Sequence, residues 1–90
     1  MKLYFNPDRA EISGQTLRWL KAFSEKAKEE SCFIQVKMDA TAPIELQRKR
    51  LNLIYTTFIN NNVDLNKVDT MFSNIEANTI IIRTIKIEKN

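Results

Sequence analysis

Hydrophobic positions along the chain recur with two different periods, and the alternation between them outlines a fold. Apolar residues at three- and four-residue spacing predict one amphipathic helix from an N-cap at Ser13 to about Glu30 and another from Pro43 to about Asn61. Between them, Cys32–Met38 alternates apolar with polar residues, which predicts a half-covered strand. Thr79–Ile87 is rich in β-branched residues and predicts the strongest strand of the chain.

Two shorter strands complete the pattern. Lys2–Phe5 is followed by Asn6-Pro7-Asp8, a tripeptide with strong turn chemistry, and Thr70–Ser73 is a candidate third strand. The resulting order β-α-β-α-β-β predicts an α/β (α+β) sandwich of two layers, in which both helices pack on one face of a mixed sheet. With 90 residues there is room for a single domain spanning 1–90.

Composition narrows the function classes. The chain has no His, which removes the commonest metal ligand and the Ser-His and Cys-His nucleophile pairs, and it has no Gly-rich phosphate loop. Cys32 is the single cysteine, so no internal disulfide can form, and we predict that it is a small buried apolar residue. The longest apolar run, Thr79–Ile82, is far shorter than the roughly 20 residues of a membrane-spanning helix. We therefore expect a non-enzymatic domain with no cofactor, no bound metal and no membrane span.

The second predicted helix carries a recognisable spacing. Its apolar, basic and terminal positions resemble the second helix of the OmpA-like, peptidoglycan-associated domain family, whose pattern is Leu-Ser-x-x-Arg-Ala-x-x-Val-x-x-x-Leu-x-x-x-Gly-Val. The matching residues here are Leu46, Arg50, Ile54, Phe58, Asn62 and Val63. Tyr4–Ile12, Ile34–Val36 and Ile82–Ile87 are similar to three other family segments, so the resemblance covers nearly the whole chain. It implies the fold of the OmpA C-terminal domain.

The resemblance also implies a site. Members of this family are non-catalytic modules that hold the diaminopimelate-containing stem peptide of peptidoglycan, a zwitterion recognised by a guanidinium and a nearby acid. Arg50 matches the guanidinium. Asp39 stands two positions earlier than the acid of the family's Gly-His-Thr-Asp segment, and Arg83 is what remains of the family's Gly-Arg-x-x-Asn-Arg-Arg segment. The predicted ligand-binding residues are therefore Arg50, Asp39 and Arg83.

These departures from the family pattern favour a degenerate member. The favoured hypothesis is a structural, scaffolding or protein-interaction module of the bacterial cell envelope, within a secretion or envelope-spanning complex. One alternative is a working peptidoglycan anchor. The periplasm or cell envelope is the expected location, with the export signal outside this chain, and the alternative is the cytoplasm.

A third hypothesis is a small cytoplasmic nucleic-acid-binding protein, because the net charge is +3 and the pI is near 9.2. Stacking on nucleic-acid bases needs aromatic residues clustered beside cations, whereas Tyr4, Trp19 and Tyr55 are scattered along the sequence. The pattern therefore disfavours nucleic acid.

Two features keep more than one interpretation. Arg48-Lys49-Arg50 is either a solvated basic face or a contact surface for a ligand, partner or nucleic acid. Trp19 lies beside the Leu17–Leu20 stripe, and we expect it to pack across the helix edge into the core, with an exposed interface anchor as the alternative.

Overall fold

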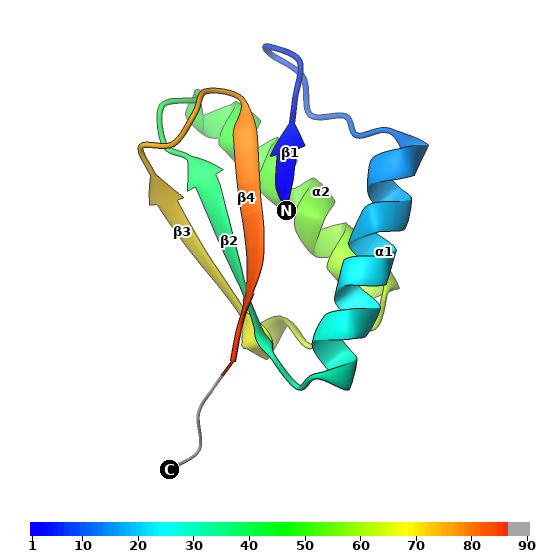
Figure 1. Ribbon diagram of the computed structural model, residues 1–90. Coiled ribbons are helices and arrows are strands. Elements are labelled where there is room, and N and C mark those ends of the chain that lie inside the picture. The colour runs from blue at the N-terminus through cyan, green and yellow to red at the C-terminus, as the bar shows by residue number, and fades with distance from the viewer. Residues whose placement is uncertain (87–90) are drawn as a thin grey trace.

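Two helices and a four-stranded sheet make up the fold in a computed structural model that describes residues 1–86 (Figure 1). The elements are, in chain order, β1 (Lys2–Tyr4), α1 (Gly14–Glu29), β2 (Phe33–Asp39), α2 (Ile44–Asn60), a 3-10 turn (Leu65–Lys67), β3 (Val68–Ser73) and β4 (Thr79–Ile85). This is the predicted order of strands and helices. The third strand begins two residues earlier than predicted, and Ile87 of the predicted last strand lies outside the described residues.

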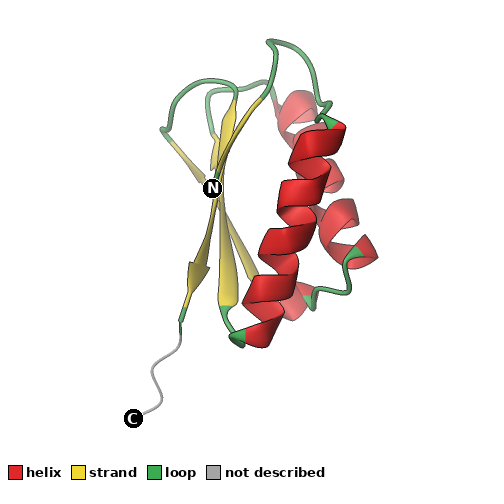
Figure 2. Cartoon of the chain, turned by 45° about the vertical axis from the view of Figure 1, so that its right-hand side comes forward, coloured by secondary structure: helices red, strands yellow, loops and turns green. Residues whose placement is uncertain are grey.

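The sheet is mixed, with the strand order β1-β4-β2-β3. β4 runs antiparallel to both β1 and β2, whereas β2 and β3 are parallel and are connected through α2. Both helices lie on one face of the sheet and leave the other face uncovered (Figure 2). The predicted two-layer sandwich is confirmed.

The core fills the space between the sheet and the helices. In β2, Ile34, Val36 and Met38 point into this space and are almost completely buried, as the alternating pattern predicted. The remaining core residues come from β1 and the residue that follows it, from both helices and from β4: Leu3, Phe5, Leu20, Ala27, Ile54, Phe58, Ile80 and Ile82. Cys32 is buried with a free thiol, which agrees with its predicted apolar role.

The helix boundaries follow from local chemistry. Ser13 is the N-cap of α1, where its hydroxyl accepts a hydrogen bond of 3.1 Å from the backbone N–H of Thr16. After α2, Asn62 adopts a positive φ of 61°, which ends the helical course in the absence of glycine. The second helix therefore ends at this asparagine run, close to the predicted end at Asn61.

One side-chain prediction is wrong. Trp19 is 51% exposed and Leu17, also on α1, is 42% exposed, because α1 buries a narrow stripe formed by Leu20, Ser24 and Ala27. Successive helical residues are rotated by about 100°, so the position before Leu20 lies outside a stripe this narrow. Trp19 is a surface residue of α1.

The strand order has one consequence for the site. Since β4 lies between β1 and β2, the connection from β3 to β4 must cross the end of β2. The last residue of β2 is Asp39, and the last residue of the connection is Asn78. The topology therefore brings together the end of β2 and the β3–β4 connection, on the sheet that α2 covers.

Candidate ligand site at the end of strand β2

Arg50 projects from α2 into the interior and is only 1% exposed. Its Nε donates to the backbone carbonyl of Arg9 at 3.0 Å, and its Nη2 donates to the carbonyl of Asn6 at 3.4 Å and to Oδ1 of Asn78 at 2.9 Å. The guanidinium carbon lies 4.7 Å from the centre of the Phe5 ring, within the range of a cation–π contact. The buried Nη1 has no hydrogen-bond partner within the described residues. Arg50 therefore ties α2 to the β1–α1 loop and to the β3–β4 connection.

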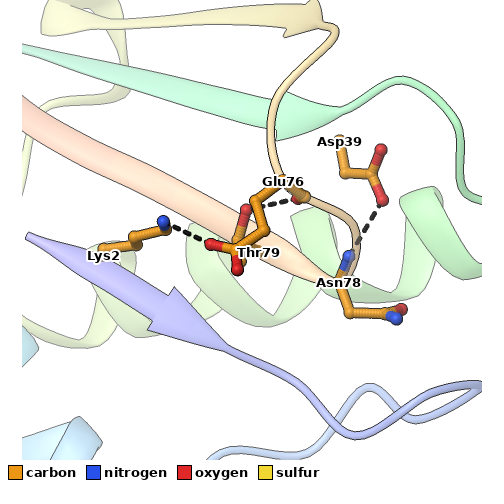
Figure 3. A network of polar contacts seen from close by, with 5 residues as sticks. All are labelled: Lys2, Asp39, Glu76, Asn78 and Thr79. Atoms are coloured by element: carbon orange, nitrogen blue, oxygen red, sulfur yellow. Dashed lines mark hydrogen bonds and ion pairs between the residues drawn. The ribbon is translucent and has the colours of Figure 1, made fainter.

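Asp39 is 4% exposed, and both of its oxygens accept hydrogen bonds. Oδ1 accepts from the backbone N–H and from the hydroxyl of Thr41, at 2.9 and 2.5 Å, and Oδ2 accepts from the backbone N–H of Asn78 at 3.0 Å (Figure 3). Burial alone raises the pKa of this carboxyl, but the hydrogen bonds from Thr41 and Asn78, with a smaller contribution from the Arg50 charge, outweigh burial and hold the pKa below its ordinary value. Asp39 is thus an ionised group that fixes two loops to the end of β2.

Asn78 connects the Asp39 carboxylate to the Arg50 guanidinium. Its backbone N–H donates to Asp39, while its side-chain Oδ1 accepts from Arg50, and its side chain points away from the Asp39 carboxylate in Figure 3. The residue has a φ of 60°, a conformation that Asn tolerates better than other residues with a Cβ. We define Asp39, Arg50 and Asn78 as the buried polar cluster.

Residues 74–78 connect the last two predicted strands, and no role was predicted for Asn78. The available signal was an Asn immediately before a β-branched strand, at a position where turns use left-handed backbone. That signal locates a turn. It does not indicate which neighbour its amide would meet.

The charge on Arg50 is retained despite burial. Removal from water lowers the pKa of the guanidinium from its ordinary value, and the charges of Asp39 and Asp8 oppose that shift. Arg48 and Lys49, by contrast, are exposed and form the solvated basic face that was one of the hypotheses. That hypothesis is wrong for Arg50, because the third residue of the run lies on the inward side of α2.

Arg83 does not join the cluster. It lies on β4 between the core residue Ile82 and Thr84, with its side chain on the uncovered face of the sheet, where Nε donates to Oε1 of Gln35 at 2.6 Å. Gln35 in turn contacts Sδ of Met71 at 3.4 Å. The three predicted residues are therefore divided: Asp39 and Arg50 are brought together through Asn78, and Arg83 is on the other side of the sheet.

A surface hollow of about 190 Å³ lies between the β1–α1 loop and the first turns of α2. It is lined by Asp8, Pro43, Glu45, Leu46 and Lys49, so it presents both signs of charge to solvent. The link to the buried polar cluster is electrostatic, because the Asp8 carboxylate acts on the Arg50 guanidinium. This hollow therefore presents the two kinds of charged group that a zwitterion needs.

The remaining candidate chemistry is sparse. No group of three His, Cys, Asp or Glu side chains in residues 1–86 is arranged to hold a metal ion. Tyr4 is exposed on β1, Trp19 is exposed on α1, and the Tyr55 hydroxyl is hydrogen-bonded to Thr70 at 2.5 Å. These aromatic residues lie on three different elements and do not form one stacking surface.

The fold is similar to that of a solved bacterial protein. The crystal structure of the peptidoglycan-associated lipoprotein from Burkholderia pseudomallei superposes with a TM-score of 0.70 at 14% sequence identity, covering 93% of this chain and 89% of that one. The chain shares the fold of that lipoprotein. The predicted fold of the OmpA C-terminal type is therefore confirmed. The sequence matches no protein-family model and no curated protein. Neither helix in the described part of the chain has the length and hydrophobicity needed to cross a membrane.

Proposed function

We propose that this chain is a non-catalytic, OmpA-like module of the bacterial cell envelope that acts through protein contacts. In this proposal its inherited peptidoglycan site has become a structural cluster. The fold likeness to a peptidoglycan-associated lipoprotein supports the envelope assignment. A periplasmic location and partners from a secretion or envelope-spanning complex are part of the same proposal.

The observation that carries the proposal is that Arg50 is buried and already hydrogen-bonded within the chain. A guanidinium that recognises a carboxylate in bidentate fashion needs two parallel N–H groups directed at the ligand. Here Nε and Nη2 already donate to Arg9, Asn6 and Asn78, and the side chain is 1% exposed. Only the buried Nη1 has no acceptor within the described residues, so a ligand carboxylate would have to open the covering loops to reach Nη1 and displace at least one of these acceptors to bind in bidentate fashion.

The carboxylate of Asp39 is also fully hydrogen-bonded within the chain. Both oxygens of Asp39 accept hydrogen bonds from the chain itself, and the residue is 4% exposed. An incoming ammonium group would compete with three donors that are already placed. The two groups that the family resemblance assigned to a zwitterion therefore hold this domain together.

A second function, retention of stem-peptide binding, is favoured by one observation. The hollow beside α2 offers the ammonium group of Lys49 for a carboxylate, and Asp8 and Glu45 for an ammonium. These groups are exposed, so a ligand would gain less from each than from a buried bidentate pair. Binding there would be weak.

Backbone NMR titration with a diaminopimelate-containing muropeptide separates the two functions. Under the proposal, the amide signals of residues 8, 39, 45–50 and 78 do not move at millimolar ligand. Saturable shifts that are lost in Lys49→Glu would overturn it and establish a working anchor. Lys49→Glu is the suitable variant because its side chain is exposed, and Lys26→Glu on α1 provides a matched charge reversal outside the hollow.

A further inference from the structure

The two edges of the sheet are protected very differently. Edge strands expose unpaired backbone groups, and proteins usually protect them by keeping them short or by placing Lys or Pro on them. β1 has three residues and carries Lys2, which is ion-paired with Glu76. β3 has six residues, Val68–Ser73, and contains neither Lys nor Pro. It is the outermost strand on its side in Figure 1, and no strand of residues 1–86 pairs with its outer side.

The orientation of the backbone in β3 identifies its free groups. The carbonyl of Ser73 accepts a hydrogen bond from Ala40, just past the end of β2, so the polar backbone groups of Ser73 face β2. These groups alternate in direction along a strand. Thr70 and Phe72 therefore direct their N–H and C=O groups away from the sheet. The Val68 carbonyl points the same way, whereas the Val68 N–H already donates to the Leu65 carbonyl of the 3-10 turn.

The side chains of this strand are self-complementary about Thr70. Val68 and Phe72 lie two positions before and after it, on the helix side of the sheet, and Phe72 is 51% exposed. If a second copy paired antiparallel through a two-fold axis at Thr70, each Val68 would face a Phe72. The two Thr70 residues would exchange two hydrogen bonds, and each Phe72 N–H would donate to a Val68 carbonyl. The neighbouring Met71 is 40% exposed on the uncovered face and would also be covered.

Charge distribution agrees with this pairing. Asp69 forms no ion pair within residues 1–86, and its partner on the neighbouring strand β2 is the uncharged Gln35. In the Thr70-centred arrangement Asp69 lies opposite Met71 of the second copy, whose neighbour on β2 is Lys37. Asp69 of one copy and Met71 and Lys37 of the other would then lie side by side on three adjacent strands. The long Lys37 side chain could extend past Met71 toward the Asp69 carboxylate.

We infer that β3 is a homodimerisation edge, through which two copies of this chain join their sheets by antiparallel β3–β3 pairing centred on Thr70. The inference is independent of the proposed function, because it uses the sheet edge opposite β1 and neither the buried polar cluster nor the hollow. The failure of either idea would therefore leave the other intact.

Sedimentation equilibrium over a range of concentrations tests the dimer. Phe72→Pro removes an outward N–H that the β2 ladder does not use, so we expect circular dichroism and the melting temperature to change little, while the dissociation constant rises at least tenfold. Ile44→Lys is the matched control, since Ile44 is an exposed apolar residue on α2, away from β3, and should leave dimerisation unchanged. A monomer at millimolar concentration, or a dimer that survives Phe72→Pro, overturns the inference.

Disulfide trapping tests the register. In a Cys32→Ala background, Thr70→Cys places two Cα atoms about 5.5 Å apart across the two-fold axis, within disulfide range. Asp69→Cys separates its two copies by roughly 8 Å, because each is displaced by a residue along antiparallel strands. Oxidation should link the Thr70→Cys chains efficiently and the Asp69→Cys chains poorly. Equal linking in both variants would overturn the Thr70-centred pairing.

Discussion

Arg50 and Arg83 were singled out by the same family resemblance, yet the fold places them in opposite environments. Arg50 is enclosed between α2, the β1–α1 loop and the β3–β4 connection, where it donates three hydrogen bonds. Arg83 lies on the uncovered face and donates one hydrogen bond to Gln35. A motif match therefore identifies a side chain but not its role, which depends on whether the chain itself supplies the hydrogen-bond acceptors.

The largest effect should follow Arg50→Ala. Removing this buried side chain leaves the carbonyls of Asn6 and Arg9 and the side-chain oxygen of Asn78 without their donor and opens a cavity, so we expect a loss of about 3–5 kcal/mol in the free energy of unfolding. Arg50→Lys should lose less, because it keeps the charge but cannot reach three acceptors as a planar fork. Urea denaturation measures both. A loss below about 1 kcal/mol for Arg50→Ala would contradict the structural role.

Asp39→Asn should cost about 2 kcal/mol at neutral pH, because an amide presents one acceptor oxygen where the carboxylate presents two. The pKa of Asp39 is depressed in the folded state, so its contribution to stability is fully present above the ordinary value of 3.8. This contribution is lost as the pH falls through the lower folded pKa. Unfolding curves from pH 6 down to pH 2 should therefore converge for the wild type and Asp39→Asn. Parallel curves over this range would argue against an ionised, hydrogen-bonded Asp39.

Asn78→Gly should cost about 1 kcal/mol. Glycine accepts the positive φ of 60° and keeps the N–H bonded to Asp39, but it removes the acceptor for Arg50. Asn78→Ala adds the cost of a left-handed backbone and should be less stable than Asn78→Gly. Thermal melting of the pair separates the side-chain contribution from the backbone contribution. The reverse ranking would show that the turn is not held at positive φ.

Arg83→Ala should have the smallest effect, below about 0.5 kcal/mol, since the side chain is exposed and its hydrogen bond competes with water. The same urea titration used for Arg50→Ala provides the measurement. A loss comparable with that of Arg50→Ala would remove the distinction between the two arginines.

Much of the fold could be predicted from local patterns. The alternation in Cys32–Met38, the Ser13 cap and the three- and four-residue spacing in both helices each depend on neighbours in sequence, and each is present in the structure. Trp19 was misplaced because the width of a buried helical stripe depends on how closely the helix approaches the sheet, which is a tertiary property. The family resemblance supplied the fold type where periodicity alone gave only the fold class.

The candidate site was less predictable. Asp39 and Arg50 were identified as a pair, but their closure depends on Asn78, which is 39 residues from Asp39 in sequence and 28 from Arg50. That contact follows from β4 lying between β1 and β2, a choice of strand order that the element order β-α-β-α-β-β does not fix. Strand alternation places Arg83 and Ile82 on opposite faces of the sheet. Which of these faces carries the buried polar cluster is known only when the position of the helices is known.

The central position of β4 also bears on how the domain acquires its structure. Leu3 pairs with Ile80, so the contact between β1 and the sheet closes a loop of 77 residues, and β2 gains its antiparallel neighbour only from the same late strand. Such distant pairings raise the contact order, and sheets dominated by them fold in milliseconds to seconds rather than microseconds. A chain shortened before Thr79 would lack the strand that joins β1 to β2. Truncation there would divide the sheet through its centre, leaving β1 with no neighbour to pair with.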